Sequence, residues 1–598
     1  MPSGKKLINT VERCVDENLE GLVMVNPGLR LVKGHRVIVR ADIEEYKAAG
    51  KVGLISGGGS GHEPGHAGYV GPGMLTASIA GSVFTSPPPG DILAAIRAAG
   101  KGNPAGVLLI VKSYTGDRLN FGIAAEKAMN EGIPVSIVVI GEDCALMSDD
   151  KTAGRRGLCG TLFIHKIAGA LAEEGKSLEE ILARTQSAAN CMGTLGVCLS
   201  PCSVPGSDAT FQIGLDEMEV GLGLHGEAGV KRMKLMSAKD TIKVMIDHMT
   251  NTKSSTHINI KKGDRIALMV NNLGATTVLE MNILVREAIL FLESKGVVVE
   301  RAYCGSFITS LEMSGISLSV LHLDDTRRRC LDASTEAPGW QKPYLPQGVS
   351  ERTTPLAIDL GEEPEVHVDN ANLRGMGVTP ENSQLLYNVL SHVCQELVSS
   401  ENHLNVLDSK CGDGDCGTTL RRGSEAILKR LGLPESPSLP VHYPHSMLLA
   451  VAQIVEEEMG GSSGALYSLF FTAAAKPLTT HVTSQAWVDA LQAGNDAITR
   501  YGRAEPGDRS MLDPLHTALQ VLKENIANPR EAIQKAADAA QAMALHTAEM
   551  KPVQSTNNLM SEMGCAYLEF QSRRNMSRNW TWTMSALLYP DWSVWLMM

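Results

Sequence analysis

The sequence predicts a multidomain protein in which two α/β subdomains are followed by an all-helical domain. A chain of 598 residues is too long for one compact core, since domains usually hold roughly 100 to 200 residues. The first half alternates short Val, Ile and Leu runs with amphipathic segments, which is typical of α/β folds. The second half repeats apolar residues at three- and four-residue spacing, which indicates helices.

In the first half we expect one domain over residues 1–335. Strands are predicted at VGLIS (52–56), GVLLIV (106–111) and VSIVVI (135–140), with amphipathic helices at ILAAIRAAG (92–100) and LFIHKIAGALAEEG (162–175). A second set of elements begins near Arg265, after a polar stretch. We therefore place the boundary between the two subdomains near 250–265.

The second half begins with a predicted linker over residues 336–372, which is rich in Pro and acidic residues and has no sustained period. A helical domain is expected over residues 373–541. Its clearest patterns are QLLYNVLSHVCQELV, HSMLLAVAQIVEEEM, QAWVDALQAGNDAITRYG and DPLHTALQVLKENIA.

Charge and cysteine content restrict the function. The net charge of −12 provides no electrostatic surface for nucleic acid or an anionic membrane. The twelve cysteines lack paired zinc spacing and are typical of reduced thiols. We see no signal peptide and no apolar run of the length of a membrane span. We therefore expect a cytosolic protein that acts on small molecules, without a nucleic-acid or membrane partner.

The run DSKCGDGDCGTT places the carboxylates of Asp408, Asp413 and Asp415 on a glycine-rich loop. Mg²⁺ prefers oxygen ligands and commonly bridges carboxylates and nucleotide phosphates. A plain acidic turn is the alternative, because Asp-Gly is common in turns. An EF-hand does not fit, because its ligand spacing is absent. The pattern predicts a divalent metal site for phosphate chemistry.

The run GGGSGHEPGH follows the first predicted strand and contains the H-E-x-x-H signature of zinc proteases. We reject that match because the signature needs a helix, whereas Pro64 and Gly65 disfavour one. The glycines are interpreted as allowing a polar ligand to approach the backbone at a strand end. A tight structural turn with a surface histidine is the alternative.

Two further polar runs are Lys112–Asp117, after a strand, and GLGLHGEAG, which places His225 among glycines. A lone histidine is usually structural. The flanking glycines, however, would let a small substrate reach the imidazole, and histidine can form covalent intermediates. A carbonyl substrate is therefore one interpretation.

Six motifs, taken together, resemble the ATP-dependent dihydroxyacetone kinase family. They are GGGSGHEPGHAG, KSYTGDRLNFG, GLGLHGEAG, DSKCGDGDCGTT, MGGSSGALY and PGDRSMLD, spread over roughly residues 4–541. The resemblance implies two α/β subdomains that bind dihydroxyacetone, a linker, and a nucleotide-binding domain built as a barrel of antiparallel helices. It also implies a homodimer.

Carried onto this sequence, the resemblance makes His225 the group that adds to the carbonyl of dihydroxyacetone or D-glyceraldehyde as a hemiaminal. Asp117 would accept the proton of the substrate hydroxyl, and His62 would hold the adduct. The remaining hydroxyls would be bound by Lys112 and by the backbone at Gly58, Ser60 and Gly61.

In the helical domain the resemblance implies Mg²⁺ ions, held by Asp408, Asp413 and Asp415, that bridge the phosphates of ATP. Plain N-capping is an alternative role for the two threonines of the metal loop. The run PGDRSMLD would lie near the adenosine by resemblance, whereas the sequence alone indicates only a turn and a helix start there. The nucleotide contacts implied are Cys416, Gly417, Thr418, Thr419, Gly461, Ser462, Ser463, Asp508, Arg509 and Met511.

Animal members of the family imply a second activity, the cleavage of FAD to AMP and cyclic FMN with Mn²⁺ or Co²⁺ at the same metal site. They also imply a cytosolic RNA-sensor protein as partner. The segment 542–598 departs from the family pattern and is expected to be a divergent tail. If it replaces a needed helix, the chain would be a catalytically impaired isoform that acts as a partner-binding regulator, or one that keeps only the lyase activity.

Overall fold

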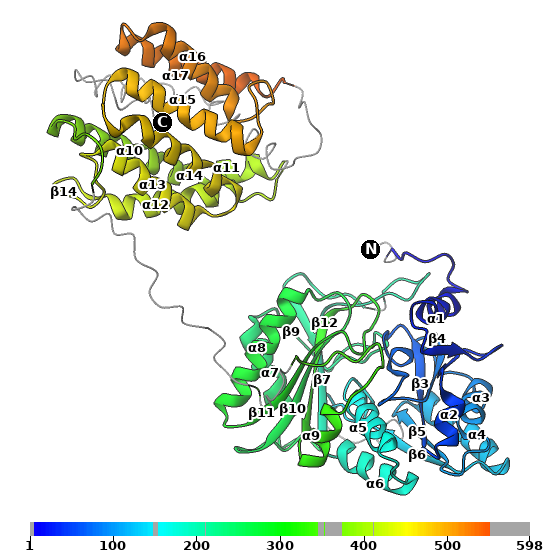
Figure 1. The fold of residues 1–598 in the computed structure, drawn as a ribbon. Coiled ribbons are helices and arrows are strands. Elements are labelled where there is room, and N and C mark those ends of the chain that lie inside the picture. The colour runs from blue at the N-terminus through cyan, green and yellow to red at the C-terminus, as the bar shows by residue number, and fades with distance from the viewer. Residues whose placement is uncertain are drawn as a thin grey trace. The chain divides into compact units, whose positions relative to one another are not determined.

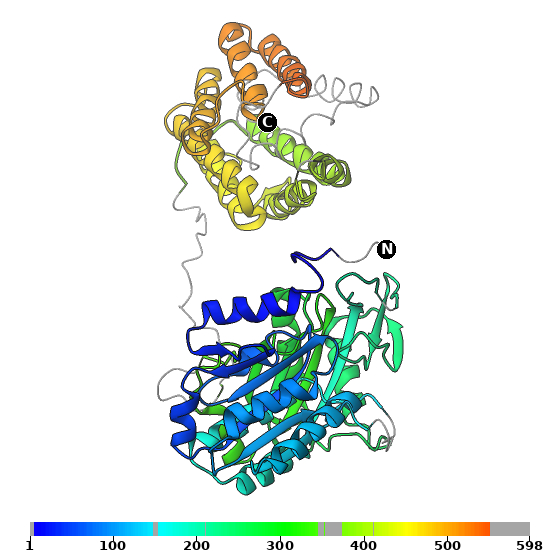
Figure 2. The ribbon, with the colours of Figure 1, turned by 90° about the vertical axis from the view of Figure 1, so that its right-hand side faces the viewer.

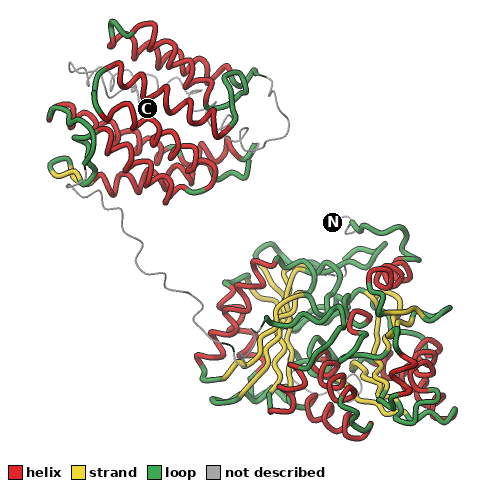
Figure 3. The backbone as a smooth tube through the Cα atoms, in the orientation of Figure 1, coloured by secondary structure: helices red, strands yellow, loops and turns green. Residues whose placement is uncertain are grey.

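The computed structural model describes residues 5–146, 154–209, 211–344, 352, 373–410 and 412–550. The chain divides into two compact units, Met1–Ala357 and Ile358–Met598. The first unit contains two six-stranded sheets, and the described part of the second is helical apart from a short hairpin (Figure 3). The predicted multidomain architecture, α/β followed by helical, is confirmed.

The first sheet has the strand order β1-β2-β4-β3-β5-β6. The three strands predicted from the sequence are β3, β5 and β6, which pair in parallel, and β4 is parallel to β3. The strands are β1 Leu29–Leu31, β2 Val37–Arg40, β3 Gly53–Ser60, β4 Ala77–Val83, β5 Val107–Lys112 and β6 Val135–Ile140. Because β3 and β5 run in parallel, their carboxyl ends lie at one edge, where polar side chains can gather.

Helices cover both faces of this sheet. The helices α3 (Pro89–Gly100) and α4 (Thr115–Asn130) pack on one face, and α5 (Thr161–Glu173) and α6 (Leu178–Ala189) also contact its strands. The helices α1 (Cys14–Val25) and α2 (Ile43–Ala48) flank it.

The second sheet has the order β11-β10-β12-β7-β8-β9. Its strands are β7 Met192–Ser200, β8 Glu217–Val220, β9 Lys231–Lys234, β10 Arg265–Asn272, β11 Val298–Gly305 and β12 Ser314–His322. The helices α7 (Ala238–Met249) and α8 (Val278–Ser294) pack against it, and α9 (Asp325–Asp332) packs against α5.

The predicted subdomain boundary near 250–265 is wrong. The strand β7 already lies inside the second sheet, paired with β12 and β8, so the two sheets divide between residues 140 and 192. The polar stretch before Arg265 is a loop that leads from α7 to β10. The strand β7 was missed because Gly193 and Gly196 interrupt its apolar run.

The helix α5 lies in the centre of the first unit (Figure 1). Its residues from Thr161 to Ala172 are all buried, although its sequence was interpreted as amphipathic. Phe163 of this helix shares one core with Leu54 of the first sheet and Met269 of the second. A helix that is covered on all sides buries its polar residues as well, and here these include His165 and Lys166.

The predicted linker starts too early. Trp340 is only 7% exposed, and the N–H groups of Glu336 and Gly339 donate to the carbonyls of Pro72 and Gly68. Residues 336–340 therefore belong to the first unit. Residues 345–351 and 353–372 of the linker lie outside the described residues.

In the second unit, consecutive helices from α12 to α17 pack side by side around one core (Figure 2). The elements are α10 Pro380–Ser399, α11 Glu401–Asp408, α12 Cys416–Leu431, β13 Gly432–Leu433, β14 Ser436–Pro437, α13 Pro444–Met459, α14 Gly461–Ala475, α15 Ser484–Gly502, α16 Leu512–Asn525 and α17 Pro529–His546. None of the helices in the described ranges is both long and apolar enough to cross a membrane.

The predicted end of the helical domain at residue 541 is also wrong, because α17 continues to His546. Ala544 is 5% exposed and Thr547 is 3% exposed, so the first residues of the expected tail are packed into the domain. Residues 551–598 of that tail lie outside the described residues.

Candidate functional site

In the first unit, His225 lies beside residues of both sheets. This residue lies on the loop 221–229 between β8 and β9, and its side chain is 21% exposed. Three rings that lie just beyond the ends of β3, β4 and β5 surround its imidazole. The distances between ring centroids are 4.6 Å for Tyr114, 5.0 Å for His62 and 5.5 Å for Phe84. The structure therefore joins motifs that lie more than a hundred residues apart in the sequence.

Glu227 orients His225. One carboxylate oxygen accepts the backbone N–H of His225 at 2.9 Å, and the other lies 3.5 Å from Nδ1. Burial opposes ionisation, but the hydrogen bond and charge of His225 lower the pKa of Glu227 to about 2. The partner of one ring nitrogen determines the role of the other, so Nε2 is the nitrogen available as a nucleophile. Sequence analysis missed Glu227, although it follows His225 by two residues.

His62 is fully buried and is fixed through Nδ1, which lies 2.8 Å from the carbonyl oxygen of Thr309. Its Nε2 has no hydrogen-bond partner among the described residues. Burial, with the charge of Lys112 and the proximity of His225, holds the pKa of His62 well below its usual range. The imidazole is therefore neutral at physiological pH and can accept a hydrogen bond at Nε2.

Lys112 ends β5, and Asp117 lies in the first turn of α4. Both are buried, and within the described residues neither Lys112 Nζ nor Asp117 Oδ1 has a partner. Burial lowers the pKa of Lys112, and burial raises the pKa of Asp117 against the effects of Lys112 and Ser86. Buried polar groups without partners are rare in folded proteins, so these groups indicate a ligand site.

The glycines 57–59 belong to the strand β3, which continues through Ser60. Residues 61–66 then form a turn, in which the N–H of Gly65 donates to the carbonyl of His62 at 3.0 Å. The alternative of a surface histidine is wrong, because His62 is buried. A Cβ on Gly58 would lie 3.4 Å from Lys112 Cε, whereas one on Gly59 would lie 2.6 Å from the backbone nitrogen of Thr85. Gly58 therefore faces the site, and Gly59 permits close packing of the following loop.

The predicted contacts at Ser60 and Gly61 are partly used inside the protein. Ser60 Oγ donates to the carbonyl of Gly81 at 2.8 Å, and the N–H of Gly61 donates to the Glu63 carboxylate at 3.0 Å. Their direct contact with substrate stays a prediction.

His62 and His66 do not share a helix, since only Ala67–Tyr69 form a 3₁₀ turn. This agrees with the rejection of the zinc-protease signature.

In the second unit, Asp408, Asp413 and Asp415 converge, and their ligand oxygens lie within 4.8 Å of one another. Asp408 is buried, and its Oδ2 accepts the N–H groups of Gly414, Asp415 and Cys416 at 3.0–3.1 Å. Its Oδ1 has no partner in the described part of the chain. Burial and the neighbouring Asp413 raise the pKa of Asp415. This all-oxygen donor set fits a hard cation such as Mg²⁺.

The first turn of α12 forms hydrogen bonds with α11 that the sequence did not predict. The N–H of Thr418 donates to Asn405 Oδ1, and its hydroxyl donates to Glu401, both at 3.1 Å. A Cβ on Gly417 would lie 2.0 Å from the Glu401 carbonyl oxygen. The alternative role of the threonines as N-caps is wrong, because Asp415 is the N-cap. Phosphate contacts at Cys416, Gly417, Thr418 and Thr419 stay predictions.

The helix α14 begins at Gly461, so Ser462 and Ser463 lie in its first turn. Gly460 and Gly461 both have positive φ, 65° and 58°, which favours glycine. Sequence analysis missed Arg422, which donates from α12 to the carbonyls of Glu458 and Met459. This side chain holds the turn before α14 beside the metal loop.

The loop before α16 is a turn and helix start, as its sequence indicates. Asp508 accepts the N–H of Glu505 at 2.8 Å, and Met511 is the N-cap of α16. Arg509 Nε donates to the carbonyl of Thr547 at 2.9 Å, which ties the loop to the end of α17. Contact with adenosine stays a prediction.

The fold and these sites define a chain in which an α/β unit with a histidine pocket precedes a helical unit with a carboxylate site. Residues 20–339 match the Dak1 domain, and residues 410–565 match the DAK2 domain, beyond the expected tail start at 542. The chain belongs to the dihydroxyacetone kinase family.

Known proteins agree with this assignment. The chain is 48% identical over 552 residues to "Triokinase/FMN cyclase" of Homo sapiens, covering 92% of this chain and 93% of that protein. It is 36% identical over 540 residues to "Dihydroxyacetone kinase" of Citrobacter freundii, covering 89% and 90%. The crystal structure of the C. freundii kinase with AMP-PNP and Mg²⁺ matches with a TM-score of 0.66 and 33% identity, over 94% of this chain and 97% of that one.

Proposed function

We propose that this chain phosphorylates dihydroxyacetone and D-glyceraldehyde with ATP, and that it also cleaves FAD to AMP and riboflavin cyclic 4',5'-phosphate. The observation that carries the kinase proposal is the pocket in which His225, oriented by Glu227, faces His62 while Lys112 and Asp117 lie buried nearby. The 48% identity to a triokinase/FMN cyclase favours this enzyme over a partner-binding regulator.

The pocket suggests how the sugar is held. His225 Nε2 forms a bond to the carbonyl carbon, the carbonyl oxygen takes up a proton, and Nδ1 releases one toward Glu227. His62 Nε2 and Lys112 bind the oxygens of the adduct, with backbone contacts at Gly58, Ser60 and Gly61. Asp117 accepts the proton of the hydroxyl that attacks the terminal phosphate.

The carboxylates of Asp408, Asp413 and Asp415 would hold Mg²⁺, which neutralises phosphate charge when bound. The solved C. freundii complex with AMP-PNP and Mg²⁺ supports this assignment. The backbone N–H groups at the start of α14, at Gly461, Ser462 and Ser463, would bind phosphate. We further propose that Mn²⁺ or Co²⁺ serves FAD cleavage at the same carboxylates.

We also propose that α10–α17 form an antiparallel barrel, supported by the side-by-side packing of consecutive helices from α12 onward. A homodimer and an RNA-sensor protein partner are proposed from the family resemblance alone. A cytosolic location is proposed from the cysteines, which are typical of reduced thiols.

The test compares His225→Ala with Asp413→Ala. We expect His225→Ala to lose sugar phosphorylation by more than about 100-fold, the scale of losing one key active-site group, while FAD cleavage persists because that reaction needs no carbonyl capture. Asp413→Ala should lose both reactions. The measurement is ATP-dependent phosphorylation of dihydroxyacetone beside AMP release from FAD.

His322→Ala serves as the matched control, since this histidine ends β12 and contacts Asp264, and it should keep both activities. Sugar phosphorylation retained by His225→Ala would refute the role of the histidine. FAD cleavage retained by Asp413→Ala would refute the shared metal site.

A further inference from the structure

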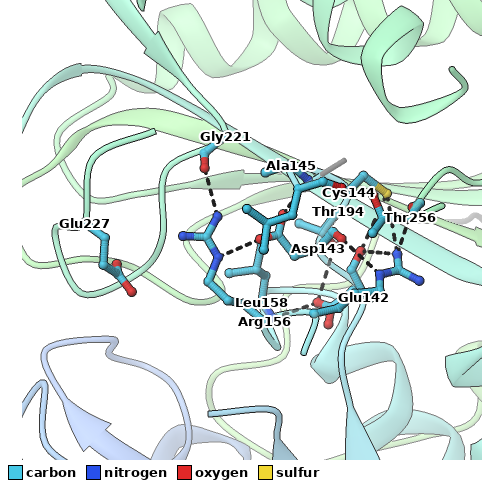
Figure 4. A network of polar contacts seen from close by, with 12 residues as sticks. Glu142, Asp143, Cys144, Ala145, Arg156, Leu158, Thr194, Gly221, Glu227 and Thr256 are labelled. Carbon is cyan, nitrogen blue, oxygen red and sulfur yellow. Dashed lines mark hydrogen bonds and ion pairs between the residues drawn. The ribbon is translucent and has the colours of Figure 1, made fainter. Parts of the chain in front are cut away.

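The loop that carries His225 is anchored by an arginine that the proposed chemistry does not use. Arg156 Nη2 donates to the carbonyl of Gly221 at 2.8 Å, at the base of the loop, and Arg156 Nε donates to Asp143 Oδ2 at 2.6 Å. The guanidinium therefore bridges a carboxylate and the loop (Figure 4). The side chain of Asp143 is 1% exposed and that of Arg156 is 17% exposed.

Asp143 lies where the two sheets join. It follows β6 of the first sheet and forms a bridge with Thr194 of β7 in the second. Its backbone N–H donates to the carbonyl of Arg156 at 3.1 Å, and its Oδ1 accepts the N–H of Ala145 at 2.8 Å. The backbone of Asp143 and its carboxylate oxygen Oδ1 are thus fixed, and the other oxygen, Oδ2, receives the guanidinium.

Arg155 forms further hydrogen bonds at this junction, the place where the two sheets join. It donates to the carbonyls of Asp143, Glu142 and Thr256 at 3.0–3.1 Å. These carbonyls belong to the end of the first sheet and to the loop before β10. The junction therefore has little freedom to move relative to either sheet.

Other hydrogen bonds also anchor the loop. The N–H of Gly221 donates to the carbonyl of Gly196 at 2.8 Å, and φ at Gly221 is +79°. Further along, Ser310 Oγ donates to the carbonyl of Leu224 at 2.6 Å. Arg156 ties the loop by a hydrogen bond to the segment that follows the first sheet, and Figure 4 shows Glu227 on the side toward which its guanidinium points.

This placement matters because the pocket is assembled from both sheets. Lys112 and Asp117 belong to the first sheet and its following helix, whereas His225 and Glu227 belong to a loop of the second. A misplacement of reacting groups by about 1 Å can cost on the order of 100-fold in rate. A rigid connection between the two sheets is therefore a catalytic requirement.

We propose that Arg156, held by Asp143, is a positioning residue that sets the distance between His225 and the groups of the first sheet. The inference rests on the proposed function, since it assumes that His225 captures the carbonyl. The plain alternative is a buried ion pair that contributes to folding only.

The experiment compares Arg156→Lys with Arg40→Lys in the full chain. Arg40 is also a buried arginine. Its guanidinium pairs with Asp42 and Glu173, and its side-chain hydrogen bonds go to these two carboxylates and not to the pocket residues named above. Lysine keeps the charge but cannot bridge two partners as the planar guanidinium does. We expect Arg156→Lys to lower kcat for dihydroxyacetone phosphorylation about 10- to 100-fold, with little change in KM for ATP. Arg40→Lys should lower only the unfolding temperature.

A spectroscopic signal separates positioning from folding. Dihydroxyacetone labelled with ¹³C at its carbonyl carbon converts a trigonal carbon to a tetrahedral one when it adds to His225, and NMR reports the fraction bound as adduct. That fraction should fall in Arg156→Lys and stay unchanged in Arg40→Lys. If Arg156→Lys does not fold, Asp143→Asn, which keeps the shape of the carboxylate, provides the same test.

Wild-type kcat and adduct signal in Arg156→Lys, or in Asp143→Asn if the arginine variant fails to fold, would overturn the inference. An equal loss of kcat in Arg40→Lys would also overturn it, in favour of a folding role. If the unaltered chain neither phosphorylates dihydroxyacetone nor forms the adduct, the proposed function fails and this inference falls with it.

Discussion

At the scale of single residues, the first unit buries several titratable groups, and Glu142 shows what burial does to them. Its Oε1 accepts the N–H of Leu158 at 2.9 Å, while Oε2 has no partner among the residues described. Burial raises the pKa of Glu142 from 4.5 to about 7, although Leu158 and Arg155 oppose the shift and Asp143 adds to it. The carboxyl therefore titrates near neutral pH in the folded protein.

This shift predicts a stability effect with a definite sign. The folded state holds the proton of Glu142 more tightly than the unfolded state does. The contribution of Glu142 to the free energy of unfolding is therefore fully present below pH 4.5 and is lost as pH rises toward 7. Glu142→Gln removes this loss. Relative to wild type, the variant should gain about 3 kcal/mol in unfolding free energy between pH 4 and pH 8.

Urea unfolding of the first unit at the two pH values measures this gain. Glu44→Gln is the control, since that side chain is 77% exposed, and it should show no such pH-dependent gain. An equal difference between Glu142→Gln and wild type at both pH values would contradict the shifted pKa.

The residues that sequence analysis could predict are those in contiguous motifs. His62, Lys112, Asp117 and His225 each lie in a polar run beside glycines or a strand end, and the structure brings His62 and His225 together. Tyr114 lies within one of these runs, but its ring contact with His225 could not be predicted. That contact and the 2.8 Å hydrogen bond from Arg156 to Gly221 join residues of the two sheets, and no local pattern encodes such contacts.

At the scale of elements, periodicity predicts the secondary structure of a segment better than it predicts the burial of that segment. The pattern of α5 indicates a helix, and it is one, but only the presence of sheets on both sides explains its complete burial. The strand β7 escaped prediction because it lacks a continuous apolar run, and its place is set by pairing with β12. Long-range pairing is information that a local pattern does not contain.

The end of α17 provides a test at this scale. Arg509 donates to the carbonyl of Thr547, and Ala544 packs into the domain, so the loop before α16 depends on residues after 541. A chain ending at residue 541 should lose ATP binding by about 10-fold or more relative to one ending at 550, because an exposed, unfixed loop must be ordered on binding. Calorimetric titration with Mg·ATP measures the difference.

The two truncations share the same missing residues 551–598, so their difference reports on residues 542–550 alone. Equal ATP affinity in both chains would show that the connection from Arg509 to Thr547 is dispensable.

At the scale of the whole molecule, the two units have separate cores. Leu54, Phe163 and Met269 share a core in the first unit, and Trp487 and Phe470 belong to the core of the second. The proposed sugar site uses only residues of the first unit, and the proposed metal and nucleotide site uses only residues of the second. Each ligand should therefore stabilise one unit.

Differential scanning calorimetry of the full chain tests this separation. A ligand that binds only the folded state adds about 2.7 kcal/mol at a concentration of 100 times its Kd. Dihydroxyacetone should raise one unfolding transition and Mg·ATP the other, and a chelator should abolish only the second shift. His225→Ala should remove the response to dihydroxyacetone and keep the response to Mg·ATP, whereas Asp413→Ala should do the reverse. If either ligand raised both transitions equally, or if a single transition were seen, the units would unfold as one cooperative body and the assignment of one ligand to each core would be wrong.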